Sequence, residues 1–140
     1  MSPPRVLETC LYAENLDETA RFYREVVGLE LVMAEGERHR FFRAAGGMVF
    51  LFNPLETPIP PPEGALPVPP HGAHGPGHVC FAADGPGIAG WRARQEAAGV
   101  AIESRVDWHN GAVSIYCRDP AGNSVEFAEA KLWGLEAAQG

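Results

Sequence analysis

Apolar and polar residues along this chain follow two periods, one typical of strands and one typical of helices. Residues 5–13 alternate and predict a strand, with Leu11 on one face and Glu8 on the other. Apolar residues then recur at helical spacing from Leu16 to Val27, and Gly28 follows where a helix would end. Three short strands are predicted next, at residues 29–35, 38–43 and 48–52, with glycines in the turns between them.

The second half of the chain repeats this order. Residues 77–83 predict a strand, and a helix is predicted from about Asp84 to Gly99. Three further strands are predicted at residues 101–106, 112–118 and 124–130. Each half therefore reads β-α-β-β-β. The predicted fold class is α+β, with two βαβββ repeats that form a pseudo-twofold open β-barrel or cup.

A proline-rich segment separates the two halves. Nine of the thirteen prolines lie in residues 54–76, a density that excludes a helix or a central strand. We interpret it as a linker or lid loop. The predicted division is a first module at residues 1–53, this loop at 54–76, a second module at 77–130 and a C-terminal tail at 131–140. Trp91 is predicted on the core face of the second helix, and Trp133 is expected to dock the C-terminal tail.

Composition narrows the choice of partners and compartment. The 140 residues are 46% hydrophobic, enough for a core, and the formal charge is −7. The chain has no run of Lys or Arg, so neither nucleic acid nor a membrane is an expected partner. Three widely spaced cysteines favour reduced thiols and a cytoplasmic location.

The duplication places residues at matching positions around one central space. Glu8 in the first strand of one half matches His78 in the other. Aligned without a gap, Leu51 matches Glu126 in the last strands. Three of these four inward positions carry metal-capable side chains. A solvated outer face is the alternative for Glu126, because glutamate is mostly exposed in proteins.

The paired units, the GHVCF strand, the RDPAGN turn and the following VEF resemble the vicinal oxygen chelate superfamily over roughly residues 5–130. That superfamily includes glyoxalase I, extradiol dioxygenases and bleomycin-resistance proteins. The resemblance implies that metal ligands come from the first and last strands of each half.

By this resemblance His78 and Glu126 match the second-half metal ligands, and Glu8 occupies a position where histidine is commonest. Leu51 lies where glyoxalase I has a glutamate, and it cannot bind a metal. Glu8, His78 and Glu126 would suit Zn²⁺, Ni²⁺, Mn²⁺ or Fe²⁺. Glu8 and Glu126 are also the candidate catalytic carboxylates, and the sequence leaves open whether Glu8 is a ligand or a base.

Other polar side chains are candidates for substrate binding, each with a structural alternative. Tyr116 is predicted to point into the cup or to pack with its hydroxyl satisfied. Alternation makes His39 rather than Arg40 the cup-side residue of its strand. The remaining candidates lie in loops and turns or, for Arg118, at a strand end where pairing with the adjacent turn is the alternative: His71, Trp108, His109 and Arg118.

Two functions are compatible with this pattern. The first is a metal-dependent enzyme, a glyoxalase-like isomerase or lyase or a dioxygenase, that acts on a small oxygenated substrate. The second is a metal-free protein that binds or sequesters a small molecule, as bleomycin-resistance proteins do. The enzyme is favoured, because His78 and two glutamates facing an apolar cup without a metal would be costly. Either is expected to be a homodimer.

Overall fold

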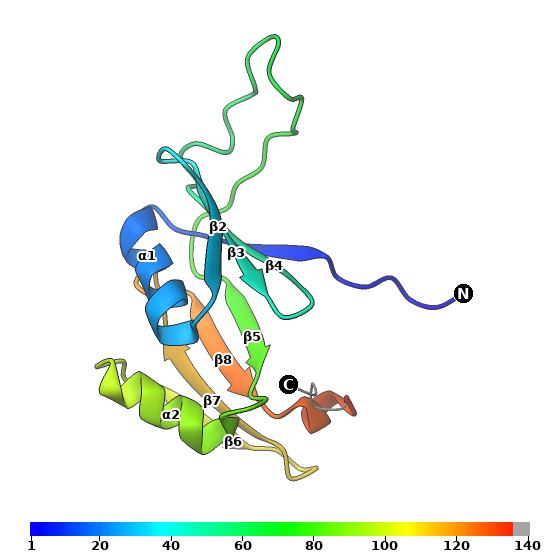
Figure 1. The fold of residues 1–140 in the computed structure, drawn as a ribbon, viewed down its shortest axis with the longest axis vertical. Helices are drawn as coiled ribbons and strands as arrows, with labels where there is room; N and C mark the ends of the chain where they lie inside the picture. The colour runs from blue at the N-terminus through cyan, green and yellow to red at the C-terminus, as the bar shows by residue number, and fades with distance from the viewer. Residues whose placement is uncertain (136–140) are drawn as a thin grey trace. The chain divides into compact units, whose positions relative to one another are not determined.

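The computed structural model describes residues 1–135 (Figure 1). The chain divides into two compact units, Met1–Pro76 and Gly77–Gly140. Each unit contains one four-stranded sheet and one principal helix. The predicted C-terminal tail lies outside the described residues from residue 136 onward. No helix among residues 1–135 is both long enough and apolar enough to cross a membrane.

Unit 1 has the element order predicted for the first repeat. Its sheet has the strand order β1-β4-β3-β2, in which β1 runs parallel to β4 and the other neighbours are antiparallel. Gly47 opens β4 where the backbone passes close to Leu7; a Cβ there would lie 2.9 Å from the Leu7 carbonyl oxygen. The strands are β1 (Glu8–Tyr12), β2 (Glu30–Glu35), β3 (His39–Ala44) and β4 (Gly47–Phe52).

The predicted helix of unit 1 forms in two parts. The α-helix α1 covers Leu16–Phe22, and a π-helical segment continues it over Tyr23–Val27. Gly28 ends the helix in the left-handed conformation, with φ 88°, as the sequence predicts. Tyr23 is fully buried and packs against Phe42 of β3, with ring centroids 6.2 Å apart.

The two faces of the unit 1 sheet differ in character. The face that carries Leu11, Phe42 and Leu51 is almost fully buried and belongs to the core with the helix. The opposite face carries aromatic rings: Phe41 stacks on Phe50 with centroids 3.8 Å apart, and Phe52 meets both edge-on. We call this second surface the aromatic face; it comprises Tyr12, Met33, His39, Phe41, Phe50 and Phe52.

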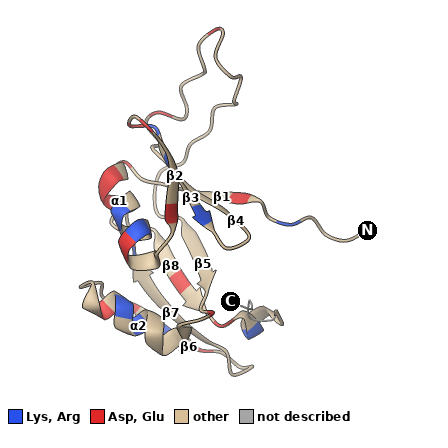
Figure 2. Ribbon diagram, in the orientation of Figure 1, with Lys and Arg blue, Asp and Glu red and all other residues tan. Residues whose placement is uncertain are grey.

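Unit 2 repeats the arrangement. Its sheet has the order β5-β8-β7-β6, with β5 parallel to β8. The helix α2 (Gly87–Ala97) lies along one face, and Trp91 stacks on Phe127 with centroids 4.3 Å apart, as the sequence predicts for a core tryptophan. Charged residues on the exposed sides of α1 and α2 include both signs (Figure 2). The strands are β5 (His78–Ala82), β6 (Ser104–Asp107), β7 (Val113–Arg118) and β8 (Ser124–Ala128).

The predicted fold class is confirmed: the chain is α+β, with one βαβββ repeat in each unit. One register prediction is wrong. Strand pairing sets Cys80 opposite Glu126, and in the other repeat sets Cys10 opposite Phe50. Phe50, not Leu51, is therefore the repeat mate of Glu126. Leu51 points to the buried side of its sheet, where it is fully enclosed.

The prediction for Trp133 is also wrong. We expected it to anchor the C-terminal tail, but it lies in a 3₁₀ turn (Ala130–Trp133) and is 78% exposed. The turn is fastened instead through Asn110, whose side-chain amide donates to the carbonyls of Lys131 and Leu132 at 3.2 and 3.3 Å. The hydrogen bonds of this segment therefore do not involve the indole ring in the described structure.

Candidate functional site

A row of polar side chains crosses the face of the unit 2 sheet that lies opposite α2. Strand register aligns Cys80, Glu126, Tyr116 and Ser104 in one row across the four strands. Because side chains alternate along a strand, His78 lies on the same face as Cys80, two residues away. The face thus gathers acid, imidazole, phenol and thiol groups, and we call it the polar face.

Glu126 and His78 form the closest pair on the polar face. The His78 Nε2 lies 3.2 Å from Glu126 Oε1, and the Glu126 side chain is 8% exposed while that of His78 is 50% exposed. The other ring nitrogen, Nδ1, lies 3.1 Å from the backbone oxygen of Ser124. A carbonyl oxygen only accepts, so Nδ1 carries the proton of that hydrogen bond.

The proton on Nδ1 determines what the other ring nitrogen of His78 presents to Glu126. A neutral ring protonated at Nδ1 presents the Nε2 lone pair to a carboxylate oxygen, and two electron donors then face one another at 3.2 Å. A cation between them, either a proton on Nε2 or a divalent metal ion, turns this repulsion into attraction. The geometry therefore suits cation binding.

Tyr116 and Cys80 surround the Glu126 carboxylate. The Tyr116 ring stacks against His78, with centroids 6.4 Å apart and planes 23° apart. Burial and a hydrogen bond to Glu126 raise the pKa of the Tyr116 phenol. Desolvation of its sulfur and the adjacent Glu126 carboxylate raise the pKa of the Cys80 thiol to about 12, although the residue is partly exposed. Both pKa shifts favour the protonated phenol and the protonated thiol beside the Glu126 carboxylate.

The turn after β6 adds one further side chain to this surface. Trp108 donates its indole N–H to Ser114 Oγ at 2.9 Å, and Ser114 shares the alternation of Tyr116 on β7. Asn110 accepts from the backbone N–H of Ala112 at 3.1 Å and holds the turn. His109, one of the predicted substrate contacts, is exposed in the same turn.

Arg118 forms hydrogen bonds with residues of its own unit. Its guanidinium forms a two-point contact with Glu103, at 2.8 and 3.2 Å, and also donates to the Gly122 carbonyl at 3.1 Å. The adjacent turn is held by Asp119, whose carboxylate accepts from the backbone N–H groups of Ala121 and Asn123 at 2.9 Å each. Arg118 is thus neutralised, and its predicted contact with a substrate stays a prediction.

Unit 1 contains Glu8 and two of the predicted histidines. Glu8 is exposed at one end of the aromatic face, in register with Met48. His39 lies on the sheet face opposite the helix, which it shares with Phe41: it is 4% exposed and stacks on Phe41 with centroids 4.0 Å apart. Arg38 donates to His39 Nδ1 at 2.7 Å, and burial together with this guanidinium lowers the pKa of the imidazole.

His71 fastens the proline-rich segment to the aromatic face. Its Nδ1 lies 2.6 Å from the Tyr12 hydroxyl, and its ring meets Phe52 edge-on at 4.5 Å. Its backbone N–H donates to the Thr57 carbonyl at 3.1 Å. His74, three residues later, is exposed, and its Nδ1 lies 3.9 Å from Glu14 Oε1. Of these two histidines, His71 is therefore packed on the face that also carries His39.

The side chains of these surfaces include imidazole and carboxylate groups, which can bind a divalent metal ion. Among residues 1–135 no group of three His, Cys, Asp or Glu side chains is close enough to hold an ion. His78 and Glu126 fit two positions of such a site, with imidazole and carboxylate donors that Zn²⁺, Ni²⁺, Mn²⁺ and Fe²⁺ accept. Glu8, the third candidate, belongs to unit 1, and the two units are described separately.

Sequence reasoning did not single out two features of these surfaces. The aromatic face could have been found from the alternation of Phe50 with Phe52 and of His39 with Phe41, since each pair shares one side of a strand. The Trp108–Ser114 hydrogen bond joins a turn to a strand six residues later and left no signal in the sequence.

The sequence and the fold of this chain both match known proteins. The model of the Glyoxalase/Bleomycin resistance protein/Dioxygenase superfamily matches residues 5–127. The crystal structure of a lactoylglutathione lyase from Agrobacterium tumefaciens is 43% identical, with a TM-score of 0.90, over 96% of this chain and 100% of that one. A search of the curated proteins found no match.

More distant structures share the fold alone. A glyoxalase/bleomycin resistance protein/dioxygenase from Nocardioides is 22% identical, with a TM-score of 0.67, over 92% of this chain and 85% of that one. A putative glyoxalase family protein from Bacillus anthracis is 16% identical, with a TM-score of 0.68, over 92% and 97%. By its sequence match and its fold, the chain belongs to the Glyoxalase/Bleomycin resistance protein/Dioxygenase superfamily.

Proposed function

We propose that this protein is a metal-dependent enzyme of the glyoxalase type that acts on a small oxygenated substrate. The observation that carries the proposal is the His78–Glu126 pair, in which an Nδ1-protonated imidazole and a buried carboxylate present donors to one another at 3.2 Å. The 43% identity to a protein described as a lactoylglutathione lyase, over nearly the whole chain, supports a lyase or isomerase rather than a ring-cleaving dioxygenase.

In this proposal Glu8, His78 and Glu126 hold the metal. A divalent ion bound there supplies a Lewis acid for the adjacent oxygens of the substrate. The Ser124 carbonyl fixes the orientation of His78. Tyr116 and Cys80 flank Glu126 in register on the two neighbouring strands.

In the proposed reaction either Glu8 or Glu126 transfers a proton between two carbons of the substrate. Conversion of a 2-oxoaldehyde hemithioacetal into a thioester removes a proton from one carbon and returns it to its neighbour. A carboxylate within hydrogen-bond reach of those carbons serves as the base and then as the acid. Glu8 and Glu126 are the candidates, and of the two Glu126 is the buried one, whose carboxylate lies 3.2 Å from His78. Hemithioacetals of 2-oxoaldehydes are the first substrates to test, and catechols the second.

A second candidate function is binding of a small molecule without metal or turnover. The aromatic face of unit 1 favours it, because stacked Phe41 and Phe50 rings and the edge of Phe52 offer an apolar surface for a flat ligand. His39, His71, Trp108, His109 and Arg118 would contribute polar contacts in either function. We further propose a cytoplasmic homodimer for both.

Metal analysis of the protein purified without a chelator tests the first proposal. We expect near-stoichiometric metal in the natural chain and its loss in His78→Ala and Glu126→Ala. Glu103→Gln is the matched control, because it removes a carboxylate of the same unit that pairs with Arg118 away from the cation position.

The two functions separate in this experiment. Absence of metal from the natural chain, and no uptake when Zn²⁺, Ni²⁺, Mn²⁺ or Fe²⁺ is added, would exclude the enzyme as proposed. Ligand screening by the quenching of tryptophan fluorescence would then test the binding protein. Metal that is retained in both variants would show that the ion binds elsewhere.

A further inference from the structure

Arg38 differs from the other arginines near the unit 1 sheet in what holds its side chain. Arg40 and Arg43 are each paired with a carboxylate. The half-buried Arg38 guanidinium instead donates to His39 Nδ1 at 2.7 Å and lies over the Phe52 ring, 5.6 Å from its centroid. Among residues 1–135 no carboxylate forms an ion pair with it. A guanidinium that is held in place without a counter-ion favours the binding of an anion.

Glu35 is the carboxylate that borders His39 on the aromatic face. Because Nδ1 of His39 accepts from Arg38, the proton of the neutral imidazole is on Nε2. Nε2 lies 3.4 Å from the Glu35 carboxylate, whose side chain is 70% exposed, so solvent screens its charge. Arg38 and Glu35 therefore contact different nitrogens of one ring, and the guanidinium keeps N–H groups that an anion can accept from.

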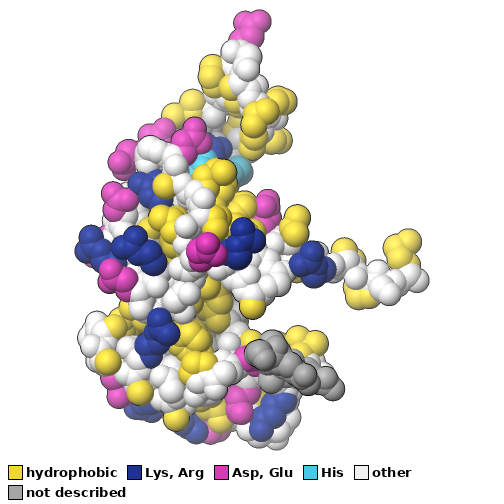
Figure 3. Space-filling model, in the orientation of Figure 1, with side chains coloured by type: hydrophobic (Ala, Val, Ile, Leu, Met, Phe, Trp, Pro, Cys, Tyr) yellow, Lys and Arg dark blue, Asp and Glu magenta, His cyan; other side chains and the backbone are white. Residues whose placement is uncertain are grey.

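Two further polar side chains lie beside the Phe52 ring. The Tyr12 hydroxyl lies 2.6 Å from His71 Nδ1, and the His71 ring meets Phe52 edge-on with centroids 4.5 Å apart. At the end of unit 1 from which the proline-rich segment extends, histidine side chains lie next to hydrophobic ones (Figure 3). We call the four polar side chains around Phe52 the Arg38 corner; they are Tyr12, Arg38, His39 and His71.

Strand register places the Arg38 corner at one end of the aromatic face and Glu8 at the other. Tyr12 is four residues after Glu8 on β1, a separation of about 13 Å at the usual rise of a strand. The row between them contains the stacked and partly exposed rings of Phe41 and Phe50. The face therefore leads from a carboxylate, across flat apolar rings, to a guanidinium.

We propose that the Arg38 corner binds the carboxylate of an aromatic acid whose ring lies on Phe41 and Phe50. The planar guanidinium matches the geometry of a carboxylate, and aromatic side chains favour a flat apolar group above them. As an account of the substrate this inference rests on the proposed function. It makes the substrate an oxygenated molecule with an aryl group and a carboxylate at the end remote from Glu8, and it leaves Glu8 open to the metal.

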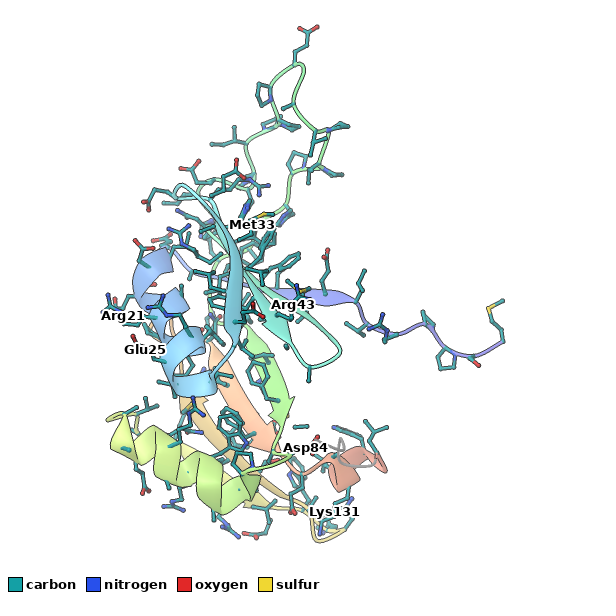
Figure 4. The ribbon with its side chains drawn as sticks, viewed as in Figure 1. Arg21, Glu25, Met33, Arg43, Asp84 and Lys131 are labelled. Carbon is teal, nitrogen blue, oxygen red and sulfur yellow. The ribbon has the colours of Figure 1, made fainter. Side chains whose placement is uncertain are left out.

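Two probes that differ only in charge test the proposal on the full-length protein in EDTA. 2-Naphthoate and 2-naphthamide carry the same ring, and titration calorimetry measures the Kd of each. We expect the naphthoate to bind about 10-fold more tightly than the amide, and Arg38→Gln to abolish that difference. Arg43→Gln is the matched control and should keep the difference, because Arg43, labelled in Figure 4, lies near the other end of β3 and is already paired with Glu30.

Equal affinity for the two probes, binding of neither, or a difference that persists in Arg38→Gln would overturn the proposal. Circular dichroism verifies that the variants fold, and NMR of the natural chain gives a test that needs no variant. The naphthoate ring protons should show nuclear Overhauser effects to the rings of Phe41 and Phe50, and effects confined to unit 2 would refute the assigned surface. Because EDTA removes metal, these results are independent of the proposed metal site: a chain that takes up no metal but distinguishes the probes would lose the enzyme and keep the Arg38 corner.

Discussion

Replacing Glu126 by glutamine separates a metal ligand from a structural ion pair. Glutamine keeps the size of the side chain and one oxygen acceptor but removes the charge. The His78–Glu126 contact joins a buried carboxylate to an imidazole that is 50% exposed, and a pair open to solvent on one side contributes at most about 1 kcal/mol. Removal of the carboxylate charge also removes its desolvation cost, which opposes that loss.

The free energy of unfolding of metal-free Glu126→Gln should therefore lie within about 1 kcal/mol of the natural value. The affinity for Zn²⁺ or Ni²⁺ should fall by about 100-fold or more, because even residues that only support metal ligands cost 10- to 100-fold. Urea unfolding in EDTA measures the first quantity, and titration calorimetry of the metal-free protein measures the second. A loss of more than about 3 kcal/mol with unchanged metal affinity would refute the reasoning.

Three further predictions concern other parts of the structure. Trp91→Ala should lower the free energy of unfolding by about 2–4 kcal/mol through lost packing on Phe127, while Trp133→Ala, at an exposed site, should change it by less than about 0.5 kcal/mol; urea unfolding compares them. In the folded chain the pKa of His39 lies below its ordinary value of 6.5. The free energy of unfolding is therefore highest above pH 6.5 and falls as the pH drops below it, by at most about 1.4 kcal/mol per pH unit. His39→Phe should flatten this part of a pH series of unfolding curves. Phe50→Glu replaces the ring that stacks on Phe41 by a carboxylate and should lower the free energy of unfolding by about 1–3 kcal/mol; an unchanged urea midpoint would contradict the stacking.

The order of the elements was predictable because each strand and helix carries a local signal. Gly28 ends the first helix, alternation puts His39 on the same sheet face as Phe41, and the turn before Ser124 contains the expected Asp and Asn. These features depend on a few neighbouring residues. The same locality explains why Trp91 was correctly interpreted as part of the core.

The register of the last strands was not predictable in this way. Aligning the glycines of the two final turns matched Leu51 to Glu126, but the turns differ in length: Ala44 pairs with Gly47, whereas Arg118 pairs with Ser124. The parallel pairing with the first strand, which no local pattern encodes, corrects the match to Phe50. A shift of one residue moves a side chain to the other face of a sheet.

The parallel pairing of first and last strands also affects how the chain is made. In unit 1 the partner of Glu8 is Met48, 40 residues later, so β1 emerges from the ribosome without its neighbour. At common rates of synthesis it waits about 2–8 s before β4 exists. Until then Leu11, which is buried in the finished fold, lacks its β4 neighbour Leu51. The first sheet, however, needs no strand of the second repeat, because its four strands all come before residue 53.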